Sequence, residues 1–193
     1  MNHRSGKKVP DSRILKAALD LFSSRGYSET KMADIAKSVG ISVGALYLRF
    51  KSKEELFLEL INDQTKDFIE RTKNLPGDSP LEALKTYIAL NIDCAFQKRQ
   101  LLSIFFREYN LAFLKPHRKE FFKTQHKIIR DILAAGIKKR VFRNVDTEDT
   151  ASMIFAGIRG TILLKLIFGI GDTKGLSNSL FELITNGIRK NDT

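Results

Sequence analysis

Residues 30–50 read TKMADIAKSVGISVGALYLRF, and this stretch decides the fold of the N-terminal part of the chain. Apolar residues at helical spacing predict a short helix that Thr30 caps and Gly40 ends, and Ser42 caps the start of another helix. Two short helices joined by a glycine turn are typical of a helix-turn-helix, in which the second helix enters the major groove of DNA. The spacing alone also fits two packing helices of an ordinary bundle.

The sequence on both sides continues the helical pattern. Apolar spacing predicts a helix over residues 11–25, and Ser52 with Glu55 forms a capping box that starts a longer helix after the motif. The segment 75–80 breaks this helix, and further helical patterns follow at 81–96, 101–109, 118–140, 146–168 and 176–188. We therefore expect an all-α protein of about nine helices, with an N-terminal three-helix DNA-binding domain and tail at residues 1–52 and a helical effector-binding and dimerisation domain at residues 53–193.

The composition of the chain indicates the cellular compartment in which the protein works. The single cysteine, Cys94, excludes an internal disulfide and fits a reducing cytoplasm, and residues 1–10 lack the apolar run of a secretory signal. Residues 151–170 are apolar enough to suggest a membrane span, but Arg159 and Lys165 lie inside it. Each would cost about 2.5 to 3.5 kcal/mol near a bilayer centre, so a buried helix at a protein interface is the better interpretation and we expect no membrane partner.

The net charge of +11 indicates a polyanionic partner. Residues 1–56 hold 11 Lys and Arg against 6 Asp and Glu, while residues 98–143 hold 13 against 3. The first basic region is expected of a DNA reader. The second needs a separate explanation.

Catalysis has no candidate residues in this sequence. The Gly-x-Ser-x-Gly, GxxxxGK and HExxH motifs are all missing, and His117 and His126 are too far apart to share one helix face as metal ligands. We expect no enzyme activity, no cofactor and no metal. A non-catalytic protein that binds DNA through charge alone remains an alternative, and it predicts no preference for an operator sequence.

The stretch 14–57, ILKAALDLFSSRGYSETKMADIAKSVGISVGALYLRFKSKEELF, closely resembles the N-terminal domain of the tetracycline-repressor (TetR) family. The resemblance implies a DNA-contacting set made of Thr30, Lys31, Ser42, Val43, Gly44, Tyr47, Leu48, Arg49, Lys51 and Lys53. Hydroxyls beside helix N-termini and nearby lysines suit phosphate contacts. The pair Leu48-Arg49 departs from the common family pattern. Leu48 can touch a thymine methyl but cannot hydrogen-bond a base, and Arg49 is either a phosphate contact or a solvated cation.

The family resemblance also implies a homodimer formed through the last two helices. We expect Ala156, Gly157, Gly160, Leu180 and Ile184 at that interface, with burial inside one subunit as the alternative. The basic tail with His3, Arg4, Lys7 and Lys8 is either a minor-groove arm or a solubilising tail.

The C-terminal part is similar to fatty-acid-degradation regulators within that family, whose effectors are long-chain acyl-CoA thioesters. Aromatic and basic residues in the middle of the chain suit an acyl chain and a phosphorylated head group. The candidate effector-binding residues are Phe105, Phe106, Arg107, Tyr109, Phe122 and Arg130. A simpler interpretation is that the aromatic residues lie in the core and the cations lie on a solvated helix face. We favour it, because long basic helix surfaces are common.

We therefore expect a regulator that binds double-stranded operator DNA and is released by a small amphipathic effector such as an acyl-CoA. A repressor that senses drugs or other apolar compounds is the alternative.

Overall fold

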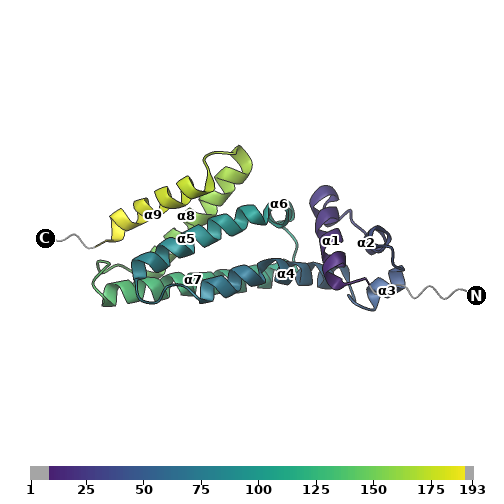
Figure 1. Ribbon diagram of the computed structural model, residues 1–193, viewed down its shortest axis with the longest axis horizontal. Helices are drawn as coiled ribbons and strands as arrows, with labels where there is room; N and C mark the ends of the chain where they lie inside the picture. Colours follow the sequence, from purple (N-terminus) through teal and green to yellow (C-terminus); the bar gives the residue numbers. More distant parts are fainter. Residues whose placement is uncertain (1–8, 190–193) are drawn as a thin grey trace, which may run out of the picture. The chain divides into compact units, whose positions relative to one another are not determined.

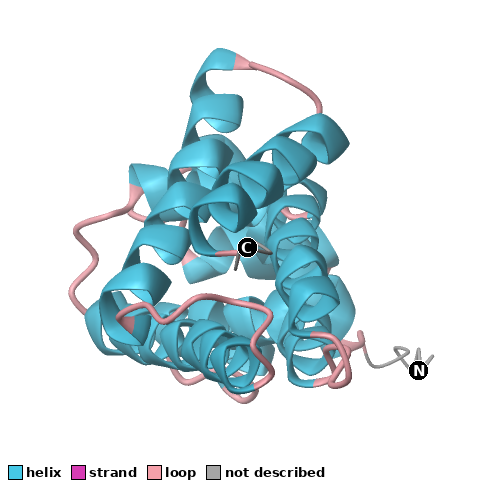
Figure 2. Ribbon diagram, turned by 90° about the vertical axis from the view of Figure 1, so that its left-hand side faces the viewer, coloured by secondary structure: helices cyan, strands magenta, loops and turns pink. Residues whose placement is uncertain are grey.

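The computed structural model describes residues 9–189, and these residues form nine α-helices (Figures 1 and 2). The expectation of an all-α protein with about nine helices is confirmed. The helices are α1 (Asp11–Arg25), α2 (Met32–Val39), α3 (Val43–Tyr47), α4 (Lys53–Lys73), α5 (Pro80–Gln97), α6 (Arg99–Arg107), α7 (Leu114–Lys138), α8 (Thr147–Phe168) and α9 (Thr173–Ile188). The basic tail with His3, Arg4, Lys7 and Lys8 lies outside the described residues.

The chain divides into two compact units, and each contains more than one stretch of sequence. Unit 1 comprises residues 1–66 and 100–111, and unit 2 comprises residues 67–99 and 112–193. This division differs from the expected boundary after residue 52, because the first part of α4 and all but the start of α6 belong to unit 1. Helix α4 is continuous and contributes to both units.

Local capping explains most of the helix starts. The Ser52 Oγ accepts a hydrogen bond from the Glu55 backbone N–H at 3.0 Å, and the Glu55 carboxylate accepts one from the Lys51 N–H at 2.6 Å. Asp146 caps α8 by accepting from two backbone N–H groups at 2.9 Å. Thr30 does not cap α2, contrary to the prediction. That helix begins at Met32, and the Asp34 carboxylate accepts from the Lys31 N–H at 3.0 Å.

The core of unit 1 is built around three aromatic rings. Phe22, Tyr27 and Phe57 lie with their ring centroids 5.2 to 5.3 Å apart, which are favourable aromatic separations. Phe105 of α6 adds a fourth ring 6.3 Å from Phe57. Buried aliphatic residues of α1 to α4, such as Ile14 and Leu46, complete this core.

Unit 2 is a bundle in which α5 contacts α7, α8 and α9. Fully buried residues such as Leu84, Ile88 and Leu133 fill its centre. At the end of α7 the Phe142 ring packs directly on Gly136, where a Cβ atom would lie 2.0 Å from the ring. A glycine is therefore required at that position.

Helix α8 is long and apolar enough to cross a membrane, with a mean hydropathy of 1.7 over its most apolar window. Only 22% of that window is buried inside the described chain. Large apolar side chains of α8 and α9 are exposed, namely Met153, Leu164, Ile167, Phe168 and Leu183. An apolar surface of this kind needs a covering partner.

Candidate nucleic-acid and effector sites

Helix α3 presents its outer side chains to solvent. Val43 is 39% exposed, Tyr47 is 47% exposed and Leu48, directly after the helix, is 90% exposed. On the opposite side of the helix, the Leu46 side chain is fully buried and anchors α3 in the core of unit 1. Gly44 faces open space, because a Cβ atom there would meet nothing within 4 Å. One side of α3 is therefore exposed and free to enter a groove of a DNA duplex.

The turn before α3 has the geometry that the sequence predicts. Gly40 has a φ of +76°, which lies in the left-handed region that favours glycine. The Ile41 N–H donates to the Ala36 carbonyl at 3.0 Å, so the chain reverses tightly. The Ser42 hydroxyl oxygen accepts from the Ala45 N–H at 3.1 Å and remains exposed. Its O–H can still donate to a phosphate.

Thr30 is in the core of unit 1, which contradicts its expected phosphate contact. Its side chain is fully buried, and its hydroxyl donates to the Gly26 carbonyl at 2.7 Å. The hydroxyl therefore closes the turn after α1, and none of its surface is left for DNA.

Lys53 also has a different role from the one that the family resemblance implies. Its ammonium group donates to the backbone carbonyls of Tyr27, Ser28 and Thr30, at 2.7, 3.3 and 3.0 Å. The same nitrogen lies 4.3 Å from the centroid of the Tyr27 ring, in cation–π contact. All three N–H donors are used inside the unit, so Lys53 fastens the start of α4 to the α1–α2 connection.

Arg49 is mostly buried, and one nitrogen of its guanidinium is used inside unit 1. Its Nη1 donates to the Val9 carbonyl and forms an ion pair with Asp11 at 3.1 Å. The side chain is only 18% exposed. By contrast, Lys31 and Lys51 are exposed and remain candidates for phosphate contacts, as is Lys37 of α2, which the sequence analysis did not single out.

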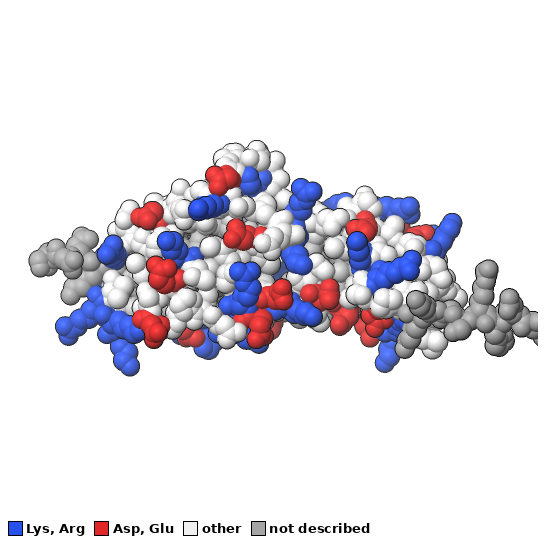
Figure 3. Space-filling model, in the orientation of Figure 1, with Lys and Arg blue, Asp and Glu red and all other residues white. Residues whose placement is uncertain are grey.

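Charges of both signs lie on the face of the protein that Figure 3 shows, where Lys and Arg are interspersed with Asp and Glu. The position of each exposed cation therefore matters more than the net charge of +11.

The six predicted effector residues do not come together within one unit. Phe105, Phe106, Arg107 and Tyr109 belong to unit 1, whereas Phe122 and Arg130 belong to unit 2. Arg107 donates to the Phe22 carbonyl and, at 3.2 Å, to the Ser23 carbonyl, where it satisfies the free C=O groups at the end of α1. Phe105 packs on Phe57 in the core of the same unit. Part of the Arg107 guanidinium is therefore used inside unit 1, and its role as an effector ligand stays a prediction.

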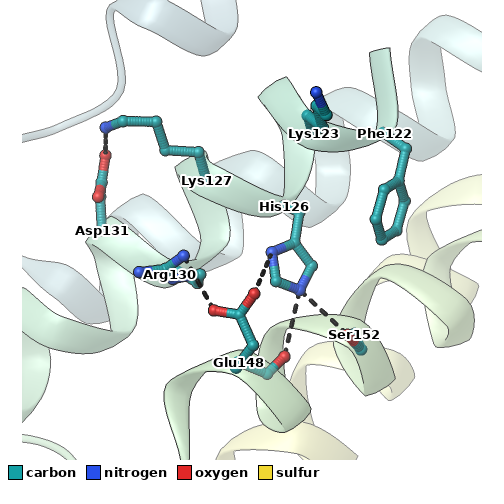
Figure 4. Close-up of a pocket in the computed structure, with 8 residues that line it drawn as sticks. All are labelled: Phe122, Lys123, His126, Lys127, Arg130, Asp131, Glu148 and Ser152. Carbon is teal, nitrogen blue, oxygen red and sulfur yellow. Dashed lines mark hydrogen bonds and ion pairs between the residues drawn. The ribbon is translucent and has the colours of Figure 1, made fainter. Parts of the chain in front are cut away.

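A hollow of about 430 Å³ lies between α7 and α8 (Figure 4). Its residues include two of the predicted set, and the full lining is Phe122, Lys123, His126, Lys127, Arg130, Asp131, Glu148 and Ser152. Arg130 pairs with Glu148 at 2.9 Å, and Lys127 pairs with Asp131 at 2.6 Å. His126 is held by the Ser152 hydroxyl, 3.0 Å from its Nε2, and by the Glu148 carbonyl at 3.2 Å.

Ion pairs within this hollow neutralise much of its charge. Lys123 is the lining cation for which the described residues supply no ion pair. The hollow presents an apolar ring, Phe122, beside this lysine and the paired cations. A weakly held amphipathic anion fits this chemistry.

The predicted dimer residues have mixed environments. A Cβ atom on Gly157 would lie 3.3 Å from Leu180 of the same chain, so this glycine gives α9 room within one subunit. Gly160 faces open space and Ala156 is exposed. Leu180 and Ile184 of α9 are half-buried.

Comparison with known proteins agrees with this architecture. Residues 14–60 match the family model described as bacterial regulatory proteins, tetR family. The fatty acid metabolism regulator protein of Bacillus subtilis is 27% identical over 94% of this chain and 97% of its own length. The transcriptional repressor KstR of Rhodococcus jostii is 33% identical over 51% of this chain and 46% of its own length.

Solved structures show the same fold. The ketosteroid transcriptional regulator KstR2 of Mycobacterium tuberculosis superposes with a TM-score of 0.73 at 24% identity, covering 96% of this chain and 98% of that one. A SmeT–triclosan complex superposes with a TM-score of 0.79 at 19% identity, covering 94% and 92%. The helix-turn-helix and these likenesses define a DNA-binding regulator of transcription, a class without enzyme activity. Over residues 14–60 the chain has the N-terminal domain of the tetR family of bacterial regulatory proteins, and over most of its length it is similar to a regulator of fatty acid metabolism.

Proposed function

We propose that this regulator is a repressor that binds a near-palindromic operator as a homodimer in the cytoplasm and leaves it when a small amphipathic effector binds. The observation that carries the DNA-binding part is the exposed outer face of α3, formed by Val43, Gly44, Tyr47 and Leu48. Two-fold symmetry of a dimer imposes two-fold symmetry on its site.

Each exposed residue of α3 suits a particular kind of contact. The Tyr47 phenol can donate to a phosphate oxygen, which positions the helix without reading sequence. Leu48 offers only apolar surface, which suits the methyl group of thymine. Ser42, Lys31 and Lys51 are exposed and provide a hydroxyl and two cations just before α3, α2 and α4. Thr30, Arg49 and Lys53 are left out of this set because their polar groups are used internally.

The exposed apolar surface of α8 and α9 supports the dimer. Large side chains at Met153, Leu164, Ile167 and Leu183 face solvent in a single chain, and α8 is mostly unburied. A second copy would cover the same surface on both chains, as an isologous interface does. Gly160 and Ala156 leave room for a close approach of α8 to its counterpart.

The effector is proposed to be an amphipathic anion, with long-chain acyl-CoA as the first candidate. The name of the Bacillus subtilis relative and the apolar and basic lining of the α7–α8 hollow support this choice. Helix α4 runs without a break from unit 1 into unit 2, so a displacement of its C-terminal end can reach its N-terminal end. A coupling of about 1 to 3 kcal/mol would lower operator affinity roughly 5- to 150-fold.

An uncharged apolar effector is the second candidate. KstR2 is described as a ketosteroid regulator, and SmeT was solved with triclosan. The exposed Phe122 in the hollow would favour such a compound as well.

The test starts from an operator selected from a randomised duplex pool. Affinity for this duplex and for a random duplex is measured across salt, because binding by charge alone gives the same steep salt slope and no affinity ratio. Tyr47→Ala should weaken binding to both duplexes, and Glu59→Ala on the exposed side of α4 serves as the control. An unchanged affinity for Tyr47→Ala would remove Tyr47 from the interface.

The effector is then tested by titrating the complex with acyl-CoA, free fatty acid and CoA alone. Release by any of the three supports an anionic effector. If none of them shifts the binding curve while the protein stays folded, the uncharged effector becomes the proposal. Sedimentation tests the dimer, and a monomer at micromolar concentration contradicts it.

A further inference from the structure

Arg159 lies in the middle of α8, inside unit 2. Its guanidinium carbon is 5.1 Å from the centroid of the Phe121 ring on α7 and 5.0 Å from that of Phe155, one turn earlier on α8. Protein surrounds the side chain on nearly all sides, although part of its surface remains accessible. The group is therefore enclosed by the bundle without being completely buried.

Within residues 9–189, no acidic residue pairs with this charge. Among the described residues, no ion pair or hydrogen bond involves the Arg159 guanidinium. Burial lowers its pKa, and the groups that act against this are the Tyr87 phenol and the Cys94 thiol. Burial also raises the pKa of both groups, so they are neutral at ordinary pH. An arginine cannot lose its proton, and a buried charge without a partner is strongly unfavourable.

The two aromatic rings stabilise the cation only in part. Cation–π contacts act on the faces of the guanidinium, whereas its five N–H donors point outward in its plane. Neither Phe121 nor Phe155 can accept these hydrogen bonds as a carboxylate would. The donors are consequently available to an anion.

Three helices each contribute two residues, spaced four apart in the sequence, to Arg159 and its neighbours. Helix α5 contributes Tyr87 and Asn91, α7 contributes Phe121 and Gln125, and α8 contributes Phe155 and Arg159. The Tyr87 hydroxyl donates to the Gln125 Oε1 at 3.0 Å, and the Asn91 amide donates to the Tyr87 carbonyl at 3.0 Å. Phe68 of α4 stacks on Phe121 with a centroid distance of 6.2 Å. The result is one cation within aromatic and neutral polar walls.

We propose that Arg159 binds the carboxylate of an apolar organic acid inside unit 2, with Phe121 and Phe155 beside the apolar body of the ligand. This inference rests on the proposed function, because it assumes that the regulator responds to a ligand. A guanidinium matches a carboxylate with two parallel hydrogen bonds, and one charge balances one charge. A thioester carbonyl carries no charge and would leave Arg159 uncompensated.

The test compares binding of an acid with binding of its neutral counterpart. Dodecanoate and 4-phenylbutanoate are the probes, and 1-dodecanol and 4-phenylbutanamide are their neutral counterparts. Binding is measured by calorimetry and by the shift of the thermal midpoint. We expect each acid that binds to do so at least 10-fold more tightly than its counterpart. If neither acid exceeds its counterpart in the wild-type protein, the proposal is overturned.

Variants separate ligand binding from a structural role. Arg159→Met should lower acid affinity at least 10-fold, leave 1-dodecanol binding unchanged, and raise the thermal midpoint of the ligand-free protein, because an unpaired buried charge is removed. Arg159→Lys should keep part of the affinity. Lys165→Met, on the same helix, is the control, because its ammonium donates to the Gly171 carbonyl, and it should keep the acid preference.

The results also distinguish this inference from the proposed function. An acid that binds through Arg159 without changing operator affinity supports the carboxylate site and contradicts an effector role for that acid. Release of Arg159→Met and wild type from DNA by the same concentration of acyl-CoA supports the proposed function, whereas equal affinity of the two proteins for the acids overturns the carboxylate site. A lower thermal midpoint for ligand-free Arg159→Met, with acid affinity unchanged, would assign Arg159 to the stability of the bundle alone.

Discussion

The cations Lys53, Arg107 and Arg49 of unit 1 have internal hydrogen-bond or ion-pair partners, whereas within the described part of the chain the enclosed Arg159 of unit 2 has none. In unit 1, Lys53 and Arg107 donate to backbone carbonyls at the ends and turns of helices, and Arg49 pairs with Asp11. In unit 2, Arg159 is enclosed among aromatic rings without an anionic partner. The difference indicates that unit 1 is complete without a ligand, whereas unit 2 holds a charge that a ligand can balance.

The largest expected effect is that of Lys53→Met. The substitution leaves three carbonyls without their charged donor and removes the contact with Tyr27, so we expect unit 1 to lose about 2 to 4 kcal/mol of stability. Denaturant unfolding followed by circular dichroism measures it. Lys51→Met, two residues earlier on the exposed surface, should change the free energy of unfolding by no more than about 0.5 kcal/mol. Equal losses for both variants would contradict the structural role of Lys53.

A smaller loss is expected for Arg107→Met. It removes two hydrogen bonds to the end of α1 at Phe22 and Ser23, and we expect a cost of about 1 to 3 kcal/mol. The same variant should keep wild-type affinity for every effector tested, as measured by calorimetry. A selective loss of effector binding would place Arg107 in the ligand site.

Thr30→Val tests the buried hydroxyl with little change in shape. The Gly26 carbonyl loses its donor, so the free energy of unfolding should fall by about 1 kcal/mol. Operator affinity should stay within about twofold of wild type at a temperature where both proteins are folded. A phosphate contact would instead show as weaker binding to the operator and to a random duplex alike.

The smallest effect is expected for Lys127→Met in unit 2. Lys127 and Asp131 form an ion pair at 2.6 Å, but their side chains are 74% and 63% exposed. Exposed pairs of this kind contribute about 0.5 kcal/mol or less, and salt weakens them. Thermal unfolding at low and high salt measures this contribution. If the free energy of unfolding fell by more than about 1 kcal/mol, exposed cations would also stabilise unit 2. The contrast between the cations of the two units would then be smaller.

Short-range signals in the sequence predicted the fold well. The bounds of α1 and the start of α8 follow from capping residues and apolar spacing that act within a few residues, such as Asp146. Helix α7 begins earlier than predicted, at Leu114, because a basic and weakly apolar first turn gives no clear pattern. Thr30 failed as a cap because its hydroxyl is used in the core, which local spacing does not reveal.

Side-chain roles were less predictable than helices. Lys53 and Arg107 looked like ligand-binding cations, because a sequence shows their charge but not the carbonyls that lie near them in the fold. Arg159 was noticed only as an argument against a membrane span. Its significance depends on what three helices place around it, and no spacing rule within one helix indicates that.

The division of unit 1 between two stretches of chain has a consequence for building hybrid regulators. A fusion at residue 52 that joins the helix-turn-helix to a foreign sensor domain would lose Lys53 and Phe57. It would also lose Arg107, which donates hydrogen bonds to the backbone carbonyls at the end of α1. The transplanted fragment would still carry every exposed residue of α3, yet much of the scaffold beneath them would be missing. A working chimera therefore needs a junction after residue 66 and a graft of residues 100–111 into the new sensor.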